Sequence, residues 1–220
     1  MKKRFLLIII MGMLLVFGGI RAQDGLNLPS ELYVLLNNGV VQRYGLGAAG
    51  VVNVTPDDVF ILDFAVAPDN DLIAYRTETG LNLLHTSNNE IIEVEADTAS
   101  IPPLRGSGET MVWTNSGNAL AYTTIYGARV MFDTGAEIPQ FSDIVVSPVV
   151  NLQWSPNGTY LAAEVENNVW WIYRRDGTEM LLASALTSSI GTAWVNDSEL
   201  VFAPEDGGLF LMDLANANQQ

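Results

Sequence analysis

The chain has 220 residues, a formal net charge of -15 at pH 7, 49% hydrophobic residues and no cysteine. This hydrophobic content predicts a folded core, and the missing cysteines exclude disulfide scaffolds, thiolate metal sites and cysteine nucleophiles. The negative charge repels phosphate backbones, so we predict no nucleic-acid partner; it suits solubility, cation attraction or a basic partner.

Residues 1–22 have the composition of a secretion signal. A basic start at Met1–Arg4 precedes an almost unbroken apolar run, Phe5–Phe17, and the small residue Ala22 suits cleavage. We therefore predict a signal peptide in 1–22, a mature domain in 23–220, and a periplasmic, cell-envelope or extracellular location. The alternative is an uncleaved N-terminal anchor, which would be the chain's only contact with a membrane.

A motif recurs four times in the rest of the chain. Each copy has a large apolar residue, a turn of Pro, Asn, Asp, Ser or Gly, and then a strand rich in Leu, Ala and aromatic residues. The copies begin at Val66, Trp113, Trp154 and Trp194, which lie 47, 41 and 40 residues apart. This pattern predicts a hairpin in a unit with the length of a β-propeller blade.

A third strand follows about 17 residues after each start, and in all but the last copy a polar turn and a fourth strand come next. The third strands are expected at 81–84, 129–132, 169–173 and 209–212. Each unit is therefore predicted to be four short antiparallel strands. A β-sandwich also has short strands, but it does not explain a shared register at near-constant spacing.

The two ends of the repeat region hold partial units. Segments 32–36, 40–44 and 51–54 are typical of the last three strands of a blade, and the final unit stops before its outermost strand. We therefore predict an all-β fold, a β-propeller of four-stranded antiparallel blades with about five blades present, the first and last of them incomplete.

Several segments carry a family resemblance. Trp154–Gly158, the strand Trp170–Tyr173, the pair Asp176-Gly177 and the strand Phe210–Leu214 resemble the blade pattern of TolB-type, WD-like propellers. The resemblance implies a periplasmic or secreted binding platform, and the family usually closes six or more blades. We therefore expect a fragment of a larger propeller; a small five-bladed ring and completion by another chain are the alternatives.

The repeated apolar positions Val66, Trp113, Trp154 and Trp194 are predicted to be structural residues of the blade core. Trp171 is assigned to the same role. Because neighbouring side chains on a strand point to opposite faces, Trp170 and Trp171 must enter different environments.

Few residues suggest chemistry. His85 is the only histidine and is predicted to be a polar residue at a strand end. Asp63, Asp143 and Glu164 are candidates for a glycosidase pair, but no pair stands out. Asp69–Asp71 could offer oxygen ligands to calcium, although turn chemistry explains these residues equally well. We therefore predict no catalytic residue, no metal site and no cofactor.

The combined prediction is an exported, non-enzymatic scaffold that binds a protein, a small molecule or a glycan. The turns at 115–117 and 157–158 are expected on one loop-rich face, where propellers often bind ligands. The alternatives are the propeller part of a larger prolyl-oligopeptidase-type hydrolase and a small propeller glycosidase or lectin. A serine nucleophile elbow in an adjoining domain would favour the hydrolase, and sugar binding would favour the lectin.

Overall fold

A computed structural model describes residues 29–46, 50–96, 110–134, 136, 138–144 and 148–216. The segment predicted to be a signal peptide lies outside these residues. In the described part of the chain the regular structure is β, apart from a short 3-10 turn at Glu166–Asn168. No helix among these residues is long and apolar enough to cross a bilayer.

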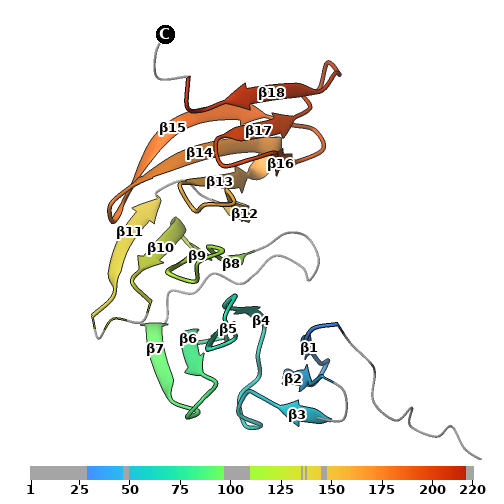
Figure 1. Cartoon of the computed structure of the whole chain (residues 1–220), viewed down its shortest axis with the longest axis vertical. Helices are drawn as coiled ribbons and strands as arrows, with labels where there is room; N and C mark the ends of the chain where they lie inside the picture. The colour runs from blue at the N-terminus through green and yellow to red at the C-terminus, as the bar shows by residue number, and fades with distance from the viewer. Residues whose placement is uncertain are drawn as a thin grey trace, which may run out of the picture. The chain divides into compact units, whose positions relative to one another are not determined.

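The strands of the described residues form five antiparallel sheets that follow one another along the chain (Figure 1), and within each sheet the strand order is the chain order. Three sheets have four strands and two have three, which confirms the expected three complete and two incomplete blades. The strands are β1 (Leu32–Leu35), β2 (Val41–Tyr44), β3 (Val51–Asn53), β4 (Asp63–Val66), β5 (Leu72–Arg76), β6 (Gly80–His85), β7 (Ile91–Ala96), β8 (Met111–Trp113), β9 (Ala119–Thr124), β10 (Gly127–Phe132), β11 (Gln140–Ile144), β12 (Val149–Trp154), β13 (Tyr160–Val165), β14 (Val169–Asp176), β15 (Glu179–Thr187), β16 (Thr192–Trp194), β17 (Glu199–Phe202) and β18 (Phe210–Asp213).

The chain divides into two compact units. One holds the described residues before Leu35 together with Gln42–Val52, and the other holds Leu35–Val41 and the described residues from Asn53 onwards. The sheets β4–β7, β8–β11, β12–β15 and β16–β18 all belong to the second unit.

The hairpin between the first two strands has the same geometry in three of these sheets. In the turn after β8, Thr114 N–H donates to Ala119 O at 2.9 Å and Gly117 N–H donates to Thr114 O at 2.9 Å. The turns after β4 and β12 repeat both bonds at the equivalent residues. The turn needs a left-handed backbone at its last residue, and asparagine or glycine occupies that position: Asn70, Gly117 and Gly158 have φ of 63°, 72° and 71°.

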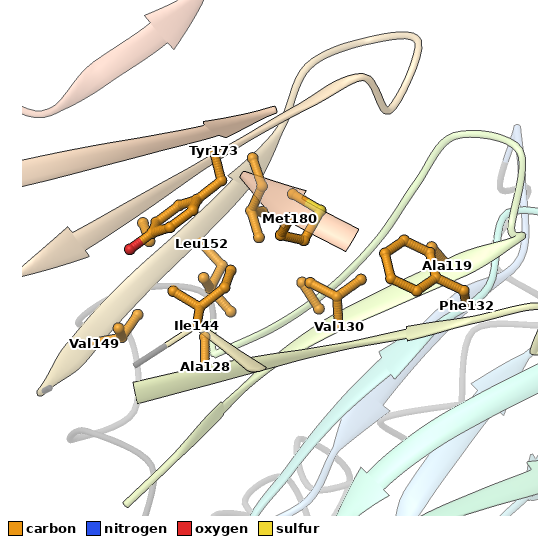
Figure 2. Packing of buried hydrophobic residues seen from close by; sticks show 12 residues of the cluster. Ala119, Ala128, Val130, Phe132, Ile144, Val149, Leu152, Tyr173 and Met180 are labelled. Carbon is orange, nitrogen blue, oxygen red and sulfur yellow. The ribbon is translucent and has the colours of Figure 1, made fainter. Parts of the chain in front are cut away.

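Three apolar clusters hold the four sheets together. Each cluster lies between two successive sheets and takes alternate side chains from the strands that face it. Figure 2 shows the middle cluster, in which Val130 and Phe132 of β10 lie with Leu152 of β12 and Met180 of β15. A sheet inside the stack therefore buries both faces, and its strands alternate between two cores.

The two adjacent tryptophans of β14 illustrate this alternation. Trp170 is fully buried in the cluster facing β16–β18, whereas Trp171 is partly buried against the cluster facing β8–β11. The tryptophan assigned to the blade core from sequence, Trp171, is thus the less buried of the pair. The sequence predicts that the two rings point to opposite faces of the sheet. It does not predict which of the two rings is more completely buried by a neighbouring sheet.

Candidate binding site

The tryptophans that begin the repeat make one contact in common. Each indole N–H donates to a backbone carbonyl on the innermost strand of the preceding sheet. The bonds are Trp113 Nε1 to Ala65 O at 3.1 Å, Trp154 Nε1 to Val112 O at 3.1 Å and Trp194 Nε1 to Gln153 O at 3.3 Å. The acceptor always lies one residue before the repeat position of its own sheet.

This contact follows from the strand register. Val66, Trp113, Trp154 and Trp194 each pair with a buried aliphatic residue on the second strand, so the four residues occupy one structural position. An indole at this position reaches the neighbouring strand, whereas Val66 has no side-chain donor. The repeat position therefore joins successive sheets by a hydrogen bond as well as by apolar packing.

The same tryptophans line a cavity of about 680 Å³ on the inner side of the four sheets. Its walls come from the innermost strands β4, β8, β12 and β16 and from the turns that follow β4 and β8. The rings of Trp113, Trp154 and Trp194 are only partly buried, because they are exposed toward this space. A cavity of this size falls within the range of small-molecule sites.

Within the part of the chain that the structure describes, no residue that lines the cavity carries a charge, although the chain has 25 acidic residues. Its polar side chains are the amides of Asn115, Asn151 and Gln153. Asn115 Nδ2 donates to Pro156 O at 2.8 Å, and Asn151 Nδ2 donates to Glu164 Oε2 at 3.3 Å. These bonds fix the orientations of the two asparagine amides, so the cavity combines three indole rings with positioned neutral hydrogen-bonding groups.

Backbone groups add to the hydrogen-bonding groups of the cavity. In an antiparallel pair, alternate residues direct their N–H and C=O toward the partner strand. Thr114 bonds to β9 and Ser155 bonds to β13, so the residues just before them, Trp113 and Trp154, direct their backbone N–H and C=O away from the sheet. Both are cavity-lining residues on edge strands, so these backbone groups lie on the side that the cavity occupies.

No protein-family model matches the chain, and no curated protein sequence matches it. Solved structures do match. The β-propeller domain of Myceliophteria thermophila Cps50 (Swd1) aligns with a TM-score of 0.59 and 16% identity, covering 84% of this chain and 67% of that one. Kluyveromyces lactis Hsv2 aligns with a TM-score of 0.54 and 12% identity, covering 87% of this chain and 62% of that one.

The chain has the β-propeller fold. The first of these structures is a β-propeller domain, so the propeller architecture expected from the repeat is supported at the level of fold. The chain spans roughly 62% to 67% of the length of these two structures. Each sheet of the second unit is accordingly called a blade below.

The turns expected to form a binding surface lie at one end of the blades and contact one another. Asn115 reaches Pro156 in the next turn, and a Cβ on Gly158 would meet Thr114 Cγ2 at 2.8 Å. Asn115 also lines the cavity, but Asn157 and Gly158 do not. The binding surface expected from the sequence therefore shares the turn of Asn115 with the cavity lining, whereas its other turn does not line the cavity.

The carboxylates considered for catalysis belong to three different strands, and each has a protein partner. Asp63 on β4 accepts a bond from Thr110, Asp143 on β11 pairs with Arg129, and Glu164 on β13 accepts from Asn151. None of the three carboxylates lines the cavity. The described residues contain no group of three or more His, Asp or Glu placed to hold a metal ion.

Hydrogen bonds hold the backbone at His85 and in the Asp69–Asp71 turn. His85 ends β6, where its backbone N–H donates to Glu90 O at 2.8 Å. In the turn, Asp69 Oδ1 accepts from Asp71 N–H at 3.1 Å, and the carbonyl of Asn70 accepts from Thr86 Oγ1 at 2.7 Å.

A charged network between two blades was not anticipated from sequence. Glu95 on β7 accepts a bond from Tyr122 Oη on β9 at 2.7 Å, and Arg129 on β10 pairs with Glu95 at 3.5 Å and with Asp143. Burial, followed by the bond to Glu95, raises the pKa of Tyr122. The bond to Asp143 raises the pKa of Arg129. These residues lie on different strands, and no local spacing could signal their meeting.

Arg76 makes a second polar link between the same blades. It is fully buried at the end of β5, and its guanidinium donates twice to Thr123 O on β9, at 3.1 Å each. Burial lowers the pKa of Arg76, while the nearby Asp63 carboxylate opposes this shift. This arginine therefore joins the strand β5 to the next blade by hydrogen bonds.

Proposed function

We propose that the chain is a non-enzymatic binding scaffold, and that its ligand site is the tryptophan-lined cavity on the inner side of the blades. The observation that carries the proposal is a cavity of about 680 Å³ with three partly exposed indoles and no charged lining residue. Rigid strands, rather than long loops, position the lining groups, which favours binding to a preformed site.

The ligand class follows from the lining. A charged ligand would lose its hydration without gaining an opposite charge, which is costly in a partly enclosed site. An uncharged group with hydrogen-bonding atoms and an apolar face can instead stack on the indoles and bond to the amides and the strand edges. Neutral glycans and uncharged peptide segments have this chemistry, and the net charge of -15 further disfavours anions.

Tryptophan fluorescence provides the test, because three of the chain's five tryptophans line the cavity. The purified chain would be titrated with neutral oligosaccharides, uncharged peptides and anionic versions of both. We expect saturable binding among the neutral probes only. The variant Gln153→Ala should weaken that binding at least several-fold, since Gln153 lines the cavity.

Gln140→Ala is the matched control, because Gln140 is an exposed residue of β11 outside the cavity lining. Binding by this variant should equal that of the parent chain. A complete lack of binding by the neutral probes, or equal loss in both variants, would contradict the proposed site.

We also propose that the chain is exported, that it is a TolB-type propeller and that it acts outside the cytoplasm. The supporting features are the basic and apolar composition of 1–22 and the Trp154–Gly158 motif. Expression of the full chain in a bacterial host should yield an exported protein whose N-terminus, measured by mass spectrometry, is Gln23. Deletion of residues 2–22 should leave the protein in the cytoplasm; export of that variant would contradict the assignment.

A further inference from the structure

A second cavity, of about 470 Å³, lies where the blade β4–β7 meets the blade β8–β11. Its lining comes from the end of β7, the end of β9 and the turn that follows it, the start of β10 and the end of β11. Among the described residues, none that lines this cavity also lines the tryptophan-lined cavity. The second cavity is therefore a separate candidate site.

Three charged side chains form one wall of this cavity, and they come from three strands. Arg129 on β10 is the cross-strand partner of Asp143 on β11, so the two side chains lie side by side on one face of the blade. Arg129 Nε donates to Asp143 Oδ1, and Arg129 Nη1 lies 3.5 Å from Glu95 Oε1 on β7. One guanidinium thus lies between two carboxylates, which leaves an excess of negative charge.

The two carboxylates differ in what they can offer to a ligand. The Glu95 side chain is 11% exposed, and its oxygens are engaged by Arg129 and by Tyr122 Oη, which donates to Oε2 at 2.7 Å. The Asp143 side chain is 58% exposed, and among the described residues no donor bonds to its Oδ2. Asp143 Oδ2 is therefore the acceptor that a ligand in the cavity can reach.

The rest of the lining is mainly apolar. It includes Ala96, Ala128, Ile144 and the exposed Tyr126, which follows β9 in the turn to β10. An aromatic ring next to a carboxylate suits a cation, because the face of the ring carries partial negative charge. Apolar walls with an acidic wall beside them suit a ligand that has an aliphatic stem and a cationic head.

We propose that this cavity binds a primary ammonium group on an aliphatic stem. The ammonium donates to Asp143 Oδ2, and the stem packs against Tyr126 and the alanines. Opposite charges attract strongly near a protein surface, and the net charge of -15 draws cations toward the chain. An anion finds no unpaired positive charge here, because Arg129 already lies between the two carboxylates.

The geometry favours an ammonium over a guanidinium. A guanidinium binds best when its fork meets both oxygens of one carboxylate, and Arg129 already holds Oδ1 of Asp143. An ammonium is a compact charge that needs only one free oxygen. A lysine side chain of a protein and a free aliphatic diamine both provide this chemistry.

Amide-resolved NMR of the isotope-labelled chain tests the proposal, because it locates weak as well as tight binding. The probes are cadaverine and capped Gly-Lys-Gly, Gly-Arg-Gly and ε-acetylated Gly-Lys-Gly peptides. We expect cadaverine, the lysine peptide or both to shift the amides of Thr124–Arg129 saturably. The acetylated peptide should cause no such shift, and the arginine peptide should bind several-fold more weakly than the better ammonium probe.

Asp143→Asn should weaken binding of the ammonium probe at least several-fold, while its amide oxygen can still accept the bond from Arg129. Asp176→Asn is the matched control, because it removes one negative charge at an exposed position that lines neither cavity. It should bind like the parent chain. Tyr126→Ala removes only an exposed ring and should weaken binding independently of the ion pairs.

The two ammonium probes separate the sources of the ligand. Binding of the lysine peptide alone supports a protein ligand, and binding of cadaverine alone supports a free amine. Absence of shifts at Thr124–Arg129 with both probes overturns the proposal. Equal weakening by Asp143→Asn and Asp176→Asn, or equal binding of the acetylated or arginine peptide, also overturns it.

Discussion

At the scale of the residue, one repeat position serves both structure and site. Trp113, Trp154 and Trp194 each donate a hydrogen bond to the preceding blade and expose part of the ring to the inner cavity. Tryptophan suits this position because its ring is large and apolar while its edge carries a single donor. Valine at position 66 fills the same place without the donor.

Gly158 provides a residue-scale prediction. Its φ of 71° disfavours any residue with a side chain, and a Cβ there would meet Thr114 Cγ2 at 2.8 Å. Because Thr114 is β-branched and buried, its methyl group has little room to move. Gly158→Ala should therefore lower the free energy of unfolding by about 2–3 kcal/mol, measured by urea denaturation.

Gly177→Ala is the control for this variant. Gly177 has a similar φ of 62°, but nothing lies within 4 Å of the added Cβ. Gly177→Ala should lower the free energy of unfolding by about 1 kcal/mol, because it adds only backbone strain. Equal losses in the two variants would show that the contact between the turns of neighbouring blades contributes nothing.

At the scale of the element, strands of neighbouring blades are joined by polar links in addition to apolar packing. Tyr122 on β9 donates to Glu95 on β7, and Arg76 on β5 donates to Thr123 on β9. Bonds to a charged partner or from a buried charge are stronger than neutral ones and costly to leave unmade. These links fix the lateral position of one blade on the next, which apolar packing alone does less precisely.

Tyr122→Phe should lower the free energy of unfolding by about 1–2 kcal/mol near neutral pH, because the ring stays and the bond to Glu95 is lost. The effect should depend on pH. The folded pKa of Tyr122 lies above its ordinary value of 10.0, so the stabilisation is complete below about pH 10 and declines as the pH rises above it.

Urea denaturation at about pH 8 and about pH 11 checks this dependence. The difference between the parent chain and Tyr122→Phe should shrink at the higher pH. Tyr75 and Tyr173 also have raised pKa values because of burial, so some alkaline destabilisation should remain in the variant. A difference that stays constant or grows would contradict the assigned role of Tyr122.

At the scale of the whole molecule, the charge balance opposes folding. The chain carries 25 acidic and 10 basic residues, so compaction brings like charges together. Added salt screens this repulsion over a distance of roughly 10 Å at 0.1 M. We therefore expect Tm, followed by circular dichroism, to rise by several degrees when NaCl is raised from low concentration.

The same measurement at about pH 4 is the control, because many carboxylates are then protonated and the repulsion is smaller. The increase in Tm with salt should shrink under these conditions. A Tm that is independent of salt at neutral pH would show that the excess negative charge has no net effect on stability.

Most of the strand pattern could be predicted from sequence because it depends on local chemistry. The turns before Leu72, Ala119 and Tyr160 contain residues that adopt turn and left-handed conformations, and the strands that follow them are rich in apolar residues. The spacing of the repeat predicted the blades because each unit repeats this local turn and strand chemistry. The candidate site was predicted less well: the turn residue Asn115 was included, but the amides Asn151 and Gln153 were not.

By itself, the sequence determined that strands, hairpins and a repeated register would form, since these follow from side-chain size, alternation and turn propensity over a few residues. Only the tertiary structure decided that the repeated indoles bond to the preceding blade and border a cavity, and that Tyr122 meets Glu95. Those contacts depend on the distance and rotation between whole sheets, which many weak apolar contacts set together and no short stretch of sequence encodes.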